Sequence, residues 1–381
     1  MLTEEEKSRY SRHLLLPEIG LTGQEKTKNA KVLVIGAGGL GCPALLYLTA
    51  MGIGEIGIVD FDRIEESNLQ RQVLYSIEDI GKLKTEAAAL KLSKQNPFVK
   101  INSFSTRLDN QNALDIISGY DIIIDGSDNF ATRYLVNDAC VLMKKPLVYG
   151  SIHKFEGQVS VFNYSDGTGN FGPTYRCLFP GPPLSGSVAN CSEIGVLGVL
   201  PGIIGTLQAT EAIKIITGIG EPLSGKLLLV DALNMSFSSI EIERNDDWVN
   251  SAPVCRQEFL KTDYEYFCGN KKSIPSAKSI SVNELHLIIE NRSDAQLLDV
   301  REILEQPQIE ELIDLQIPLG KLSEQSHLIS KNKKVIVFCK SGLRSQRAIE
   351  ILETDFGFDN LHNLEGGILE WQKQNSKALE K

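Results

Sequence analysis

Short apolar runs and amphipathic stretches alternate through the first 243 residues of the chain. The apolar runs predict strands near residues 31–35, 55–59, 99–104, 121–125, 146–150, 157–163 and 226–231. The stretches with helical spacing predict helices near residues 40–51, 82–95, 109–118, 129–143 and 203–217. Strands that alternate with helices are typical of a parallel sheet covered on both faces. We therefore predict an α/β domain with a Rossmann-like, mostly parallel sheet.

A second and smaller α/β pattern begins at residue 279. It predicts a helix near 281–290, strands at 296–299 and 334–338, a loop at 339–344 and a helix at 345–354. Between the two patterns, residues 245–278 keep neither the helical nor the strand period, as expected of a linker. We predict three parts: a first domain over residues 1–243, a linker over 244–278 and a second domain over 279–381.

Composition narrows the class of protein. The 381 residues include 42% hydrophobic and 23% charged residues, and the formal net charge of −10 argues against nucleic acid as a partner. The longest uncharged run, 194–210, is too short and too broken by glycine and proline for a membrane span. The N-terminus shows no signal peptide, and seven irregularly spaced cysteines indicate free thiols. We expect a cytoplasmic protein with no nucleic acid and no membrane partner.

A glycine-rich turn, Gly36–Gly41, follows the first predicted strand. Such a turn brings bare backbone close to phosphate and directs helix N–H groups at it. Asp60 ends the second strand 19 residues after Gly41, where a ribose hydroxyl needs an acceptor, and Asp62 follows it. A turn of this kind is also typical of NAD sites. The residues around the turn therefore decide between NAD and a nucleoside triphosphate.

Those surrounding residues favour a triphosphate. Asn68 and Arg71 lie just beyond the acid, and an arginine binds phosphate through two N–H groups. Lys84 starts the next helix, and Asp128 follows a strand end, where open sheets bind ligands and where a carboxylate suits Mg²⁺.

Each of these residues also has a plainer interpretation. Three such interpretations remain open: Lys84 could be a solvated helix residue, Arg71 could pair with Glu65 or Glu66, and Asp125 could cap a helix. Their joint spacing argues against all three plainer interpretations together.

Six segments resemble the MoeB/ThiF family, whose fold is of the ubiquitin-activating type. They are residues 9–12, 36–41, 60–62, 67–72, 81–84 and 127–129. The resemblance covers about residues 1–243 and implies adenylation of the C-terminal glycine of a ubiquitin-like sulfur carrier such as MoaD or ThiS.

The resemblance also implies the roles of single residues. Mg-ATP would be bound by Gly36, Gly38, Gly39, Gly41, Asp60, Asp62, Asn68, Arg71, Lys84, Asp128 and Asn129. Arg71 and Asp128 would take part in catalysis: Asp128 would hold the metal, and this metal with Arg71, Lys84 and Arg12 would stabilise charge on the α-phosphate. In a homodimer, Arg12 would reach the ATP of the other subunit; it lies on a helix that the capping box Thr3–Glu6 opens.

Residues 339–344, which we call the Cys339 loop, carry the second chemical signal. The loop joins a strand to a helix, so backbone N–H groups and the helix start favour a thiolate or persulfide at Cys339. Arg344 adds a fixed cation, and the four residues between Cys339 and Arg344 make a loop that suits one sulfur atom better than a phosphate. A buried small hydrophobe is the plainer interpretation of Cys339.

The second domain resembles a rhodanese domain. Residues 297–302, 317–319 and 365–368, with Trp371, support the resemblance, which implies sulfur transfer through a persulfide at Cys339. Asp299 is expected to hold the Cys339 loop, and Gly366 with Gly367 to make a turn. The His-Ile-Pro-Gly segment common in the family is absent before Ile317, so residues 305–316 depart from its pattern.

The remaining cysteines give weaker signals. In related enzymes a cysteine at the position of Cys191 attacks the acyl-adenylate or resolves an acyl-disulfide; a structural residue on a crossover loop is the alternative. Relatives also carry paired cysteines for zinc near Cys177, but this chain has Thr174 there and only isolated Cys255 and Cys268 beyond it. We therefore expect no structural zinc.

These observations predict an ATP-dependent adenylyltransferase and sulfurtransferase. The sulfur would come from a cysteine desulfurase, and the carrier thiocarboxylate would serve molybdopterin or thiamine biosynthesis. Two alternatives stay open: an NAD-dependent oxidoreductase fused to a rhodanese, and a non-catalytic scaffold that binds a carrier and relays sulfur.

Overall fold

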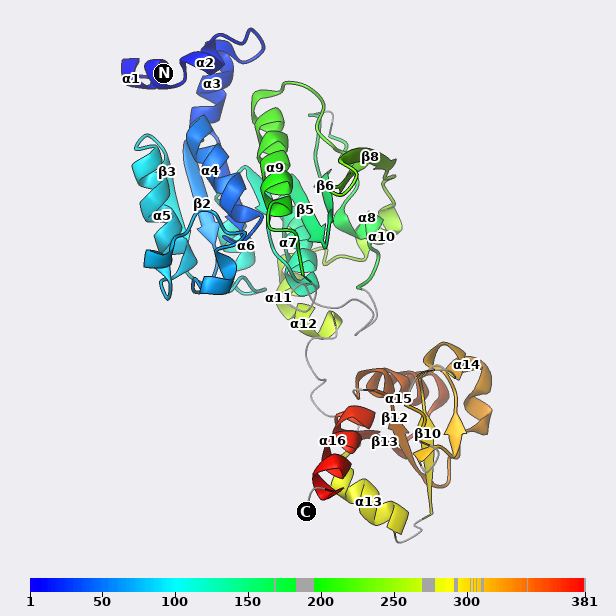
Figure 1. The fold of residues 1–381 in the computed structure, drawn as a ribbon. Coiled ribbons are helices and arrows are strands. Elements are labelled where there is room, and N and C mark those ends of the chain that lie inside the picture. Colours follow the sequence, from blue (N-terminus) through cyan, green and yellow to red (C-terminus); the bar gives the residue numbers. More distant parts are fainter. Residues whose placement is uncertain are drawn as a thin grey trace. The chain divides into compact units, whose positions relative to one another are not determined.

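The computed structural model describes residues 1–167, 169–182, 195–268, 278–290, 294–301, 303, 305, 307–309, 312–340 and 342–379. The described chain forms two compact units, one ending at Cys268 and one beginning at Lys278 (Figure 1). Within the described residues, no helix combines the length and apolar character needed to cross a bilayer.

The first unit is built on a sheet with the strand order β3-β2-β1-β4-β5-β6-β7-β8. The strands are β1 (Lys31–Ile35), β2 (Glu55–Val59), β3 (Lys100–Phe104), β4 (Ile122–Asp125), β5 (Leu147–His153), β6 (Glu156–Phe162), β7 (Lys226–Asp231) and β8 (Ser236–Glu241). Pairing is parallel from β3 to β5 and antiparallel from β5 to β8. The strand order reverses direction between β1 and β4, which makes their carboxyl ends a switch point where such sheets bind ligands.

Helices cover both faces of this sheet, as predicted (Figure 1). They are α1 (Glu4–Arg9), α2 (Ser11–Leu14), α3 (Gly20–Asn29), α4 (Gly41–Met51), α5 (Lys84–Gln95), α6 (Ala113–Ser118), α7 (Phe130–Met143), α8 (Tyr175–Leu178) and α9 (Leu200–Thr217). The Thr3–Glu6 capping box is present, but the single N-terminal helix expected after it is interrupted at Tyr10. Neither α3, which contains two glycines, nor β8, whose residues are exposed on both faces, was predicted from the sequence.

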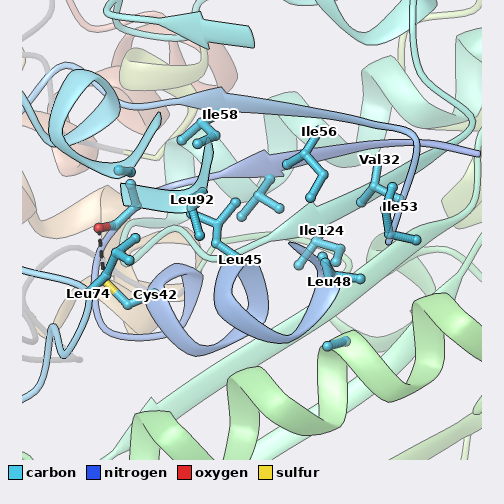
Figure 2. Close-up of a cluster of buried hydrophobic side chains, with 14 of the residues drawn as sticks. Val32, Cys42, Leu45, Leu48, Ile53, Ile56, Ile58, Leu74, Leu92 and Ile124 are labelled. Carbon is cyan, nitrogen blue, oxygen red and sulfur yellow. Dashed lines mark hydrogen bonds between the residues drawn. The ribbon is translucent and has the colours of Figure 1, made fainter. Parts of the chain in front are cut away.

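Side chains of α4 anchor the glycine-rich turn to the sheet. Cys42, Leu45 and Leu48 are fully buried against strand residues such as Val32 and Ile56 (Figure 2). The Cys42 thiol donates to the Ala37 carbonyl at 3.4 Å, and burial raises the pKa of Cys42 to about 12. Full burial of a leucine contributes roughly 1.5–3 kcal/mol, so these contacts fix where α4 begins.

Residues 245–268 belong to the first unit. They form α10 (Asp246–Asn250), α11 (Arg256–Lys261) and α12 (Tyr264–Phe267), which contact α7 and α8. A buried ion pair joins Arg176 and Asp138 at 2.7 Å, and the Tyr264 hydroxyl donates to Asp138 at 2.9 Å. Helices of four to six residues are too short to show a period, which is why the sequence indicated a linker over 244–278.

The second unit has a parallel sheet with the order β11-β10-β12-β13-β9. Its elements are β9 (Lys278–Ile280), α13 (Val282–Glu290), β10 (Ala295–Asp299), β11 (Leu315–Gln316), α14 (Leu322–Gln325), β12 (Lys334–Phe338), α15 (Leu343–Phe356), β13 (Leu361–Leu364) and α16 (Gly367–Leu379). Neighbouring strand residues enter different cores: Leu298 and Val337 pack in one cluster, Leu297 and Ile336 in the other. Successive side chains of a strand point to opposite faces of the sheet, so this alternation shows that both faces are covered.

Candidate active sites

A cavity of about 540 Å³ opens at the switch point of the first unit, and we call it the switch-point cavity. Its lining includes the predicted residues Gly36, Gly38, Gly39, Asp60, Asp62, Asn68, Arg71, Lys84, Asp128 and Asn129. Gly41 and Arg12, which were also predicted, do not line it; Arg12 is exposed on α2. The structure thus brings together side chains from separate elements that the sequence placed in one site.

Glycine is required in this turn for steric reasons. Gly36 has a φ of +88°, which L side chains rarely adopt, and a Cβ there would lie 2.8 Å from the Gly126 carbonyl oxygen. A Cβ on Gly41 would lie 1.9 Å from the carbonyl oxygen of Gly36. Gly41 therefore permits the close packing of the turn on α4 and forms no part of the cavity wall.

Asp60 braces the turn from the end of β2. One carboxylate oxygen accepts from the Ala37 N–H and the other from the Asp62 N–H, each at 2.8 Å. Burial raises the pKa of Asp60. Each oxygen keeps a further lone pair, so the carboxylate can still accept a hydrogen bond from a ligand.

Lys84 is buried, so its interpretation as a solvated helix residue was wrong. Its ammonium lies 2.7 Å from an Asp62 carboxylate oxygen, and its side chain is 7% exposed. The Tyr75 hydroxyl lies 2.8 Å from the Ala37 carbonyl oxygen and 3.2 Å from that of Lys84. Tyr75 thus ties the glycine-rich turn to the start of α5, a role the sequence did not indicate.

Arg71 is held without neutralisation of its charge. Its guanidinium donates to the Ser67 carbonyl oxygen at 3.2 Å. Among the described residues, the ion pair with Glu65 or Glu66 that the sequence left open is not formed. Asn68 accepts from the Glu65 N–H at 3.2 Å, which shapes the turn that carries Arg71.

The segment after β4 presents a carboxylate to the cavity. Asp125 accepts from the Ser127 N–H at 2.9 Å, whereas Asn129, not Asp125, caps α7 by accepting from the Thr132 N–H at 2.9 Å. Burial raises the pKa of Asp125. Asp128 is exposed in the cavity, and no hydrogen bond or ion pair engages its carboxylate within the described chain.

The sequence did not indicate two further features, one in the cavity wall and one behind the strand ends. Arg107 lies over the Phe61 ring, 5.7 Å from its centroid, and pairs with Glu265 of α12. Gln208 of α9 donates to the Asp125 carbonyl oxygen at 2.7 Å and to that of Val148 at 3.3 Å, which joins the ends of β4 and β5. Thr206 and Thr210 flank Gln208 in the same helix, so nothing local marked Gln208, and nothing local links Arg107 to Glu265.

The sulfur of Cys339 is enclosed by its own loop. Cys339 follows β12 and is buried, and its Sγ accepts from the Gly342 N–H at 3.2 Å. The Ser345 hydroxyl lies 3.5 Å from the sulfur and donates to Asn363 at 2.7 Å. Gly342 has a φ of +90° and starts α15. The sulfur therefore has a backbone N–H and a hydroxyl close to it, while Cys339 also packs in a hydrophobic cluster of the second unit.

The surroundings of the Cys339 loop depart from one expectation. Gly366 and Gly367 both have positive φ and make the expected turn; a Cβ on Gly367 would lie 2.3 Å from the Cys339 carbonyl oxygen. In the part of the chain that the structure describes, the Asp299 side chain binds Arg301 and not the loop, at 2.7 Å between Oδ2 and Nη2. Arg344 pairs with Glu305.

The other cysteines are scattered. Cys42 and Cys140 are buried, as predicted, and burial raises the pKa of Cys268 to about 12. Cys191 lies outside the described residues. Within the residues that are described, no three His, Cys, Asp or Glu side chains gather as a metal site.

Two family models match the chain. The model of the ThiF family covers residues 10–254, and the model of the rhodanese-like domain covers residues 281–374.

Curated relatives match over most of their length. The chain is 43% identical to the probable adenylyltransferase/sulfurtransferase MoeZ of Mycobacterium tuberculosis, over 98% of this chain and 94% of that one. It is 52% identical to the sulfur carrier protein adenylyltransferase of Thermus thermophilus, over 70% of this chain and 98% of the relative. The adenylyltransferase and sulfurtransferase MOCS3 of Drosophila grimshawi is 39% identical, over 98% of this chain and 85% of that one.

Solved structures agree with the fold of the first unit. Escherichia coli MccB with ATP aligns with a TM-score of 0.55 at 26% identity, over 64% of this chain and 73% of that one. The switch-point cavity, the Cys339 loop and these matches lead to one assignment. The chain is a member of the ThiF family that carries a C-terminal rhodanese-like domain, and it is an enzyme that combines adenylyltransferase and sulfurtransferase activities.

Proposed function

We propose that the chain adenylates the C-terminal glycine of a ubiquitin-like sulfur carrier in the switch-point cavity and then delivers sulfur to it from Cys339. The observation that carries the proposal is the convergence of Arg71, Lys84 and Asp128 on one cavity beside the glycine-rich turn. The Thermus relative, named for adenylation of a sulfur carrier protein, supports this substrate class. The same family membership favours adenylation over an NAD-dependent oxidoreductase or a non-catalytic scaffold.

The cavity offers groups for each part of ATP. Phe61 and Arg107 provide flat surfaces for a base, and Asp60 provides an acceptor for the ribose. Arg71 and Lys84 provide positive charge for the phosphates. Lys84 is already fixed by Asp62, so little side-chain freedom is lost when it engages a phosphate.

In the first step, a carboxylate oxygen of the carrier glycine attacks the α-phosphorus of ATP. The bond between this phosphorus and the bridging oxygen to the β-phosphate breaks, and pyrophosphate leaves with the electron pair. The product is an acyl-adenylate. Both reactants are anionic, so the reaction needs Arg71 and Lys84 to stabilise charge and to align the two groups.

The donor set fits Mg²⁺ held jointly by protein and nucleotide. Asp128 is an exposed carboxylate without a partner among the described side chains, and magnesium is bound by one or two carboxylates together with phosphate oxygens. When bound, the ion would neutralise phosphate charge. Asp128 would hold it, with the Asn129 side chain committed to capping α7.

In the second step, the Cys339 thiolate takes the terminal sulfur of a persulfide, for which a cysteine desulfurase is the expected donor, and the donor leaves as a thiolate. The terminal sulfur on Cys339 then attacks the acyl carbonyl, the bond to the adenylate oxygen breaks, and AMP leaves. The Gly342 N–H donates to Sγ of Cys339, and together with the start of α15 it favours negative charge on Sγ before the sulfur is accepted.

The third step releases the carrier. A thiolate, from Cys191 or from an external thiol, attacks Sγ of Cys339, and the S–S bond breaks to give a C-terminal thiocarboxylate and a new disulfide. We further propose a homodimer in the cytoplasm, in which Arg12 reaches the ATP of the other subunit. Molybdopterin and thiamine biosynthesis are the two candidate pathways.

One experiment tests the whole proposal. The full chain is incubated with ATP, a candidate carrier and a persulfide donor, and the carrier is weighed by mass spectrometry. We expect a carrier that has gained one sulfur in place of one oxygen, and carrier-dependent exchange between pyrophosphate and ATP. A bound dinucleotide in the switch-point cavity, or exchange with no dependence on any carrier, would contradict it.

A further inference from the structure

The cation of the Cys339 loop is paired with an acid. Arg344 lies in the first turn of α15, with its Nη1 2.7 Å from one carboxylate oxygen of Glu305 and its Nη2 2.5 Å from the other. The two side chains are 27% and 22% exposed, so solvent screens the pair only in part. These hydrogen bonds to Glu305 raise the pKa of Arg344.

Glu305 is held in place by a buried neighbour. Arg301 is fully buried, pairs with Asp299, and donates to the Pro307 carbonyl oxygen at 2.9 Å. Its Nη1 also lies 3.5 Å from the backbone oxygen of Glu305 itself. The backbone carbonyls of Glu305 and Pro307 therefore face an ion pair that water does not reach, which helps to hold the acid where its carboxylate meets Arg344.

This pairing changes which sulfur donors the loop attracts. A two-point pair contributes no net charge and occupies two of the five N–H donors of Arg344. Lys340, which is exposed, remains as a cation of the loop. A small dianion such as thiosulfate depends on such charges for binding, whereas a persulfide donor without net charge, such as the zwitterion of cysteamine persulfide, does not.

We propose that Glu305 is a specificity-determining residue of the Cys339 loop that disfavours small dianionic sulfur donors and so reserves Cys339 for persulfides. The inference rests on the proposed function of Cys339 as a sulfur acceptor. It goes beyond that function because it assigns the choice of donor to a residue that does not touch the transferred sulfur.

The competing reaction is chemically complete. The Cys339 thiolate attacks the outer sulfur of thiosulfate, the S–S bond breaks, and sulfite leaves with the electron pair. Cyanide then attacks the terminal sulfur of the persulfide, which releases thiocyanate and restores the thiolate. Only the first step involves binding of a dianion, so Glu305 acts there.

The test compares Glu305→Gln with the unchanged full chain on two donors, thiosulfate and cysteamine persulfide, with cyanide as acceptor. The amide keeps the size of the side chain and frees the charge of Arg344. We expect kcat/KM for thiosulfate to rise about tenfold through a lower KM, equivalent to about 1.4 kcal/mol. That gain should shrink as salt is added, and the rate with cysteamine persulfide should stay within twofold.

The matched control is Glu350→Gln, which breaks the exposed pair between Arg347 and Glu350 on the same helix and should change neither donor. If Glu305→Gln does not fold, Glu305→Asp shortens the acid so that it reaches one nitrogen, and a smaller rise is expected. A change below twofold for thiosulfate, or an equal rise for both donors, would overturn the inference. Absence of any persulfide on Cys339 in the unchanged chain would instead overturn the proposed function.

Discussion

Charged side chains around the switch-point cavity come from segments far apart in the chain, whereas the Cys339 loop holds its sulfur largely with its own backbone. Arg71, Lys84 and Asp128 follow different elements and meet only in the folded sheet. Around Cys339, the Gly342 N–H contacts the sulfur directly, and the one nearby guanidinium described, that of Arg344, is already paired. The comparison teaches that a multiply charged ligand calls for charged side chains facing an open cavity, where Arg71 forms no ion pair among the described residues and Lys84 is held by Asp62, while a single sulfur calls for close donors.

The largest effect is expected at the sulfur itself. Cys339→Ser should abolish formation of carrier thiocarboxylate from a persulfide donor, because no other atom of the loop can carry the sulfur. The rate of exchange between pyrophosphate and ATP should stay within twofold of that of the unchanged chain, since this reaction takes place in the first unit. Mass spectrometry of the carrier and the exchange assay check both, with Cys255→Ser, an exposed cysteine, as control. Normal thiocarboxylate in Cys339→Ser would break the comparison.

A large but partial effect is expected at the cavity. Asp128→Ala should reduce carrier-dependent pyrophosphate exchange by about 10²–10³, or ~2.7–4 kcal/mol, because the carboxylate that would hold the Mg²⁺ is lost and the phosphates then lack that cation. Asp247→Ala, at an exposed position of α10, is the matched control. Exchange near the unchanged rate in Asp128→Ala would show that the cavity does not depend on this charge.

A smaller effect is expected at Asp79, which forms ion pairs with Lys82 and Lys91 in the first unit. Burial raises the pKa of Asp79, but hydrogen bonds from Lys91, Ser76 and Lys82 outweigh it and leave the pKa lowered. The stabilisation is therefore present above the unfolded-state pKa of about 3.9 and is lost as the pH falls below it. Asp79→Asn should cost about 1.5–3 kcal/mol of unfolding free energy at pH 7.

Urea unfolding at a series of pH values measures this difference. The gap between the unchanged chain and Asp79→Asn should shrink as the pH falls below about 4, because Asp79 is then protonated in the unfolded chain while its lowered pKa keeps it ionised in the folded chain. A gap that stays constant across the series would assign the effect to packing.

The smallest effect is expected from a side chain of the Cys339 loop. Ser345→Ala removes the hydroxyl 3.5 Å from the sulfur and should slow persulfide formation by two- to tenfold, or about 0.5–1.5 kcal/mol. Gly342→Ala should be slower still, because its φ of +90° strains any L side chain. A greater loss in Ser345→Ala than in Gly342→Ala would reverse the comparison between side-chain and backbone control.

The same contrast explains what the sequence could predict. The glycine-rich turn and the Cys339 loop are contiguous, so local spacing carries their geometry, and both were predicted. Tyr75 and Gln208 act through backbone oxygens that are distant in sequence, so no local pattern identified them. Short helices such as α12 hold their positions through contacts with residues distant in sequence and are too short to show a period.

The attachment of α12 has a consequence for how such chains are assembled from parts. Tyr264 completes the buried Arg176–Asp138 cluster, and Glu265 pairs with Arg107 at the cavity. A gene fusion that joined the second domain directly at residue 243 would remove both contacts. The switch-point cavity would lose the Arg107–Glu265 ion pair, and the buried Asp138 would lose the hydrogen bond from Tyr264. The boundary between the two units lies after Cys268. The Thermus relative is matched over 270 residues and 98% of its length, so it is about as long as the part of the chain before this boundary.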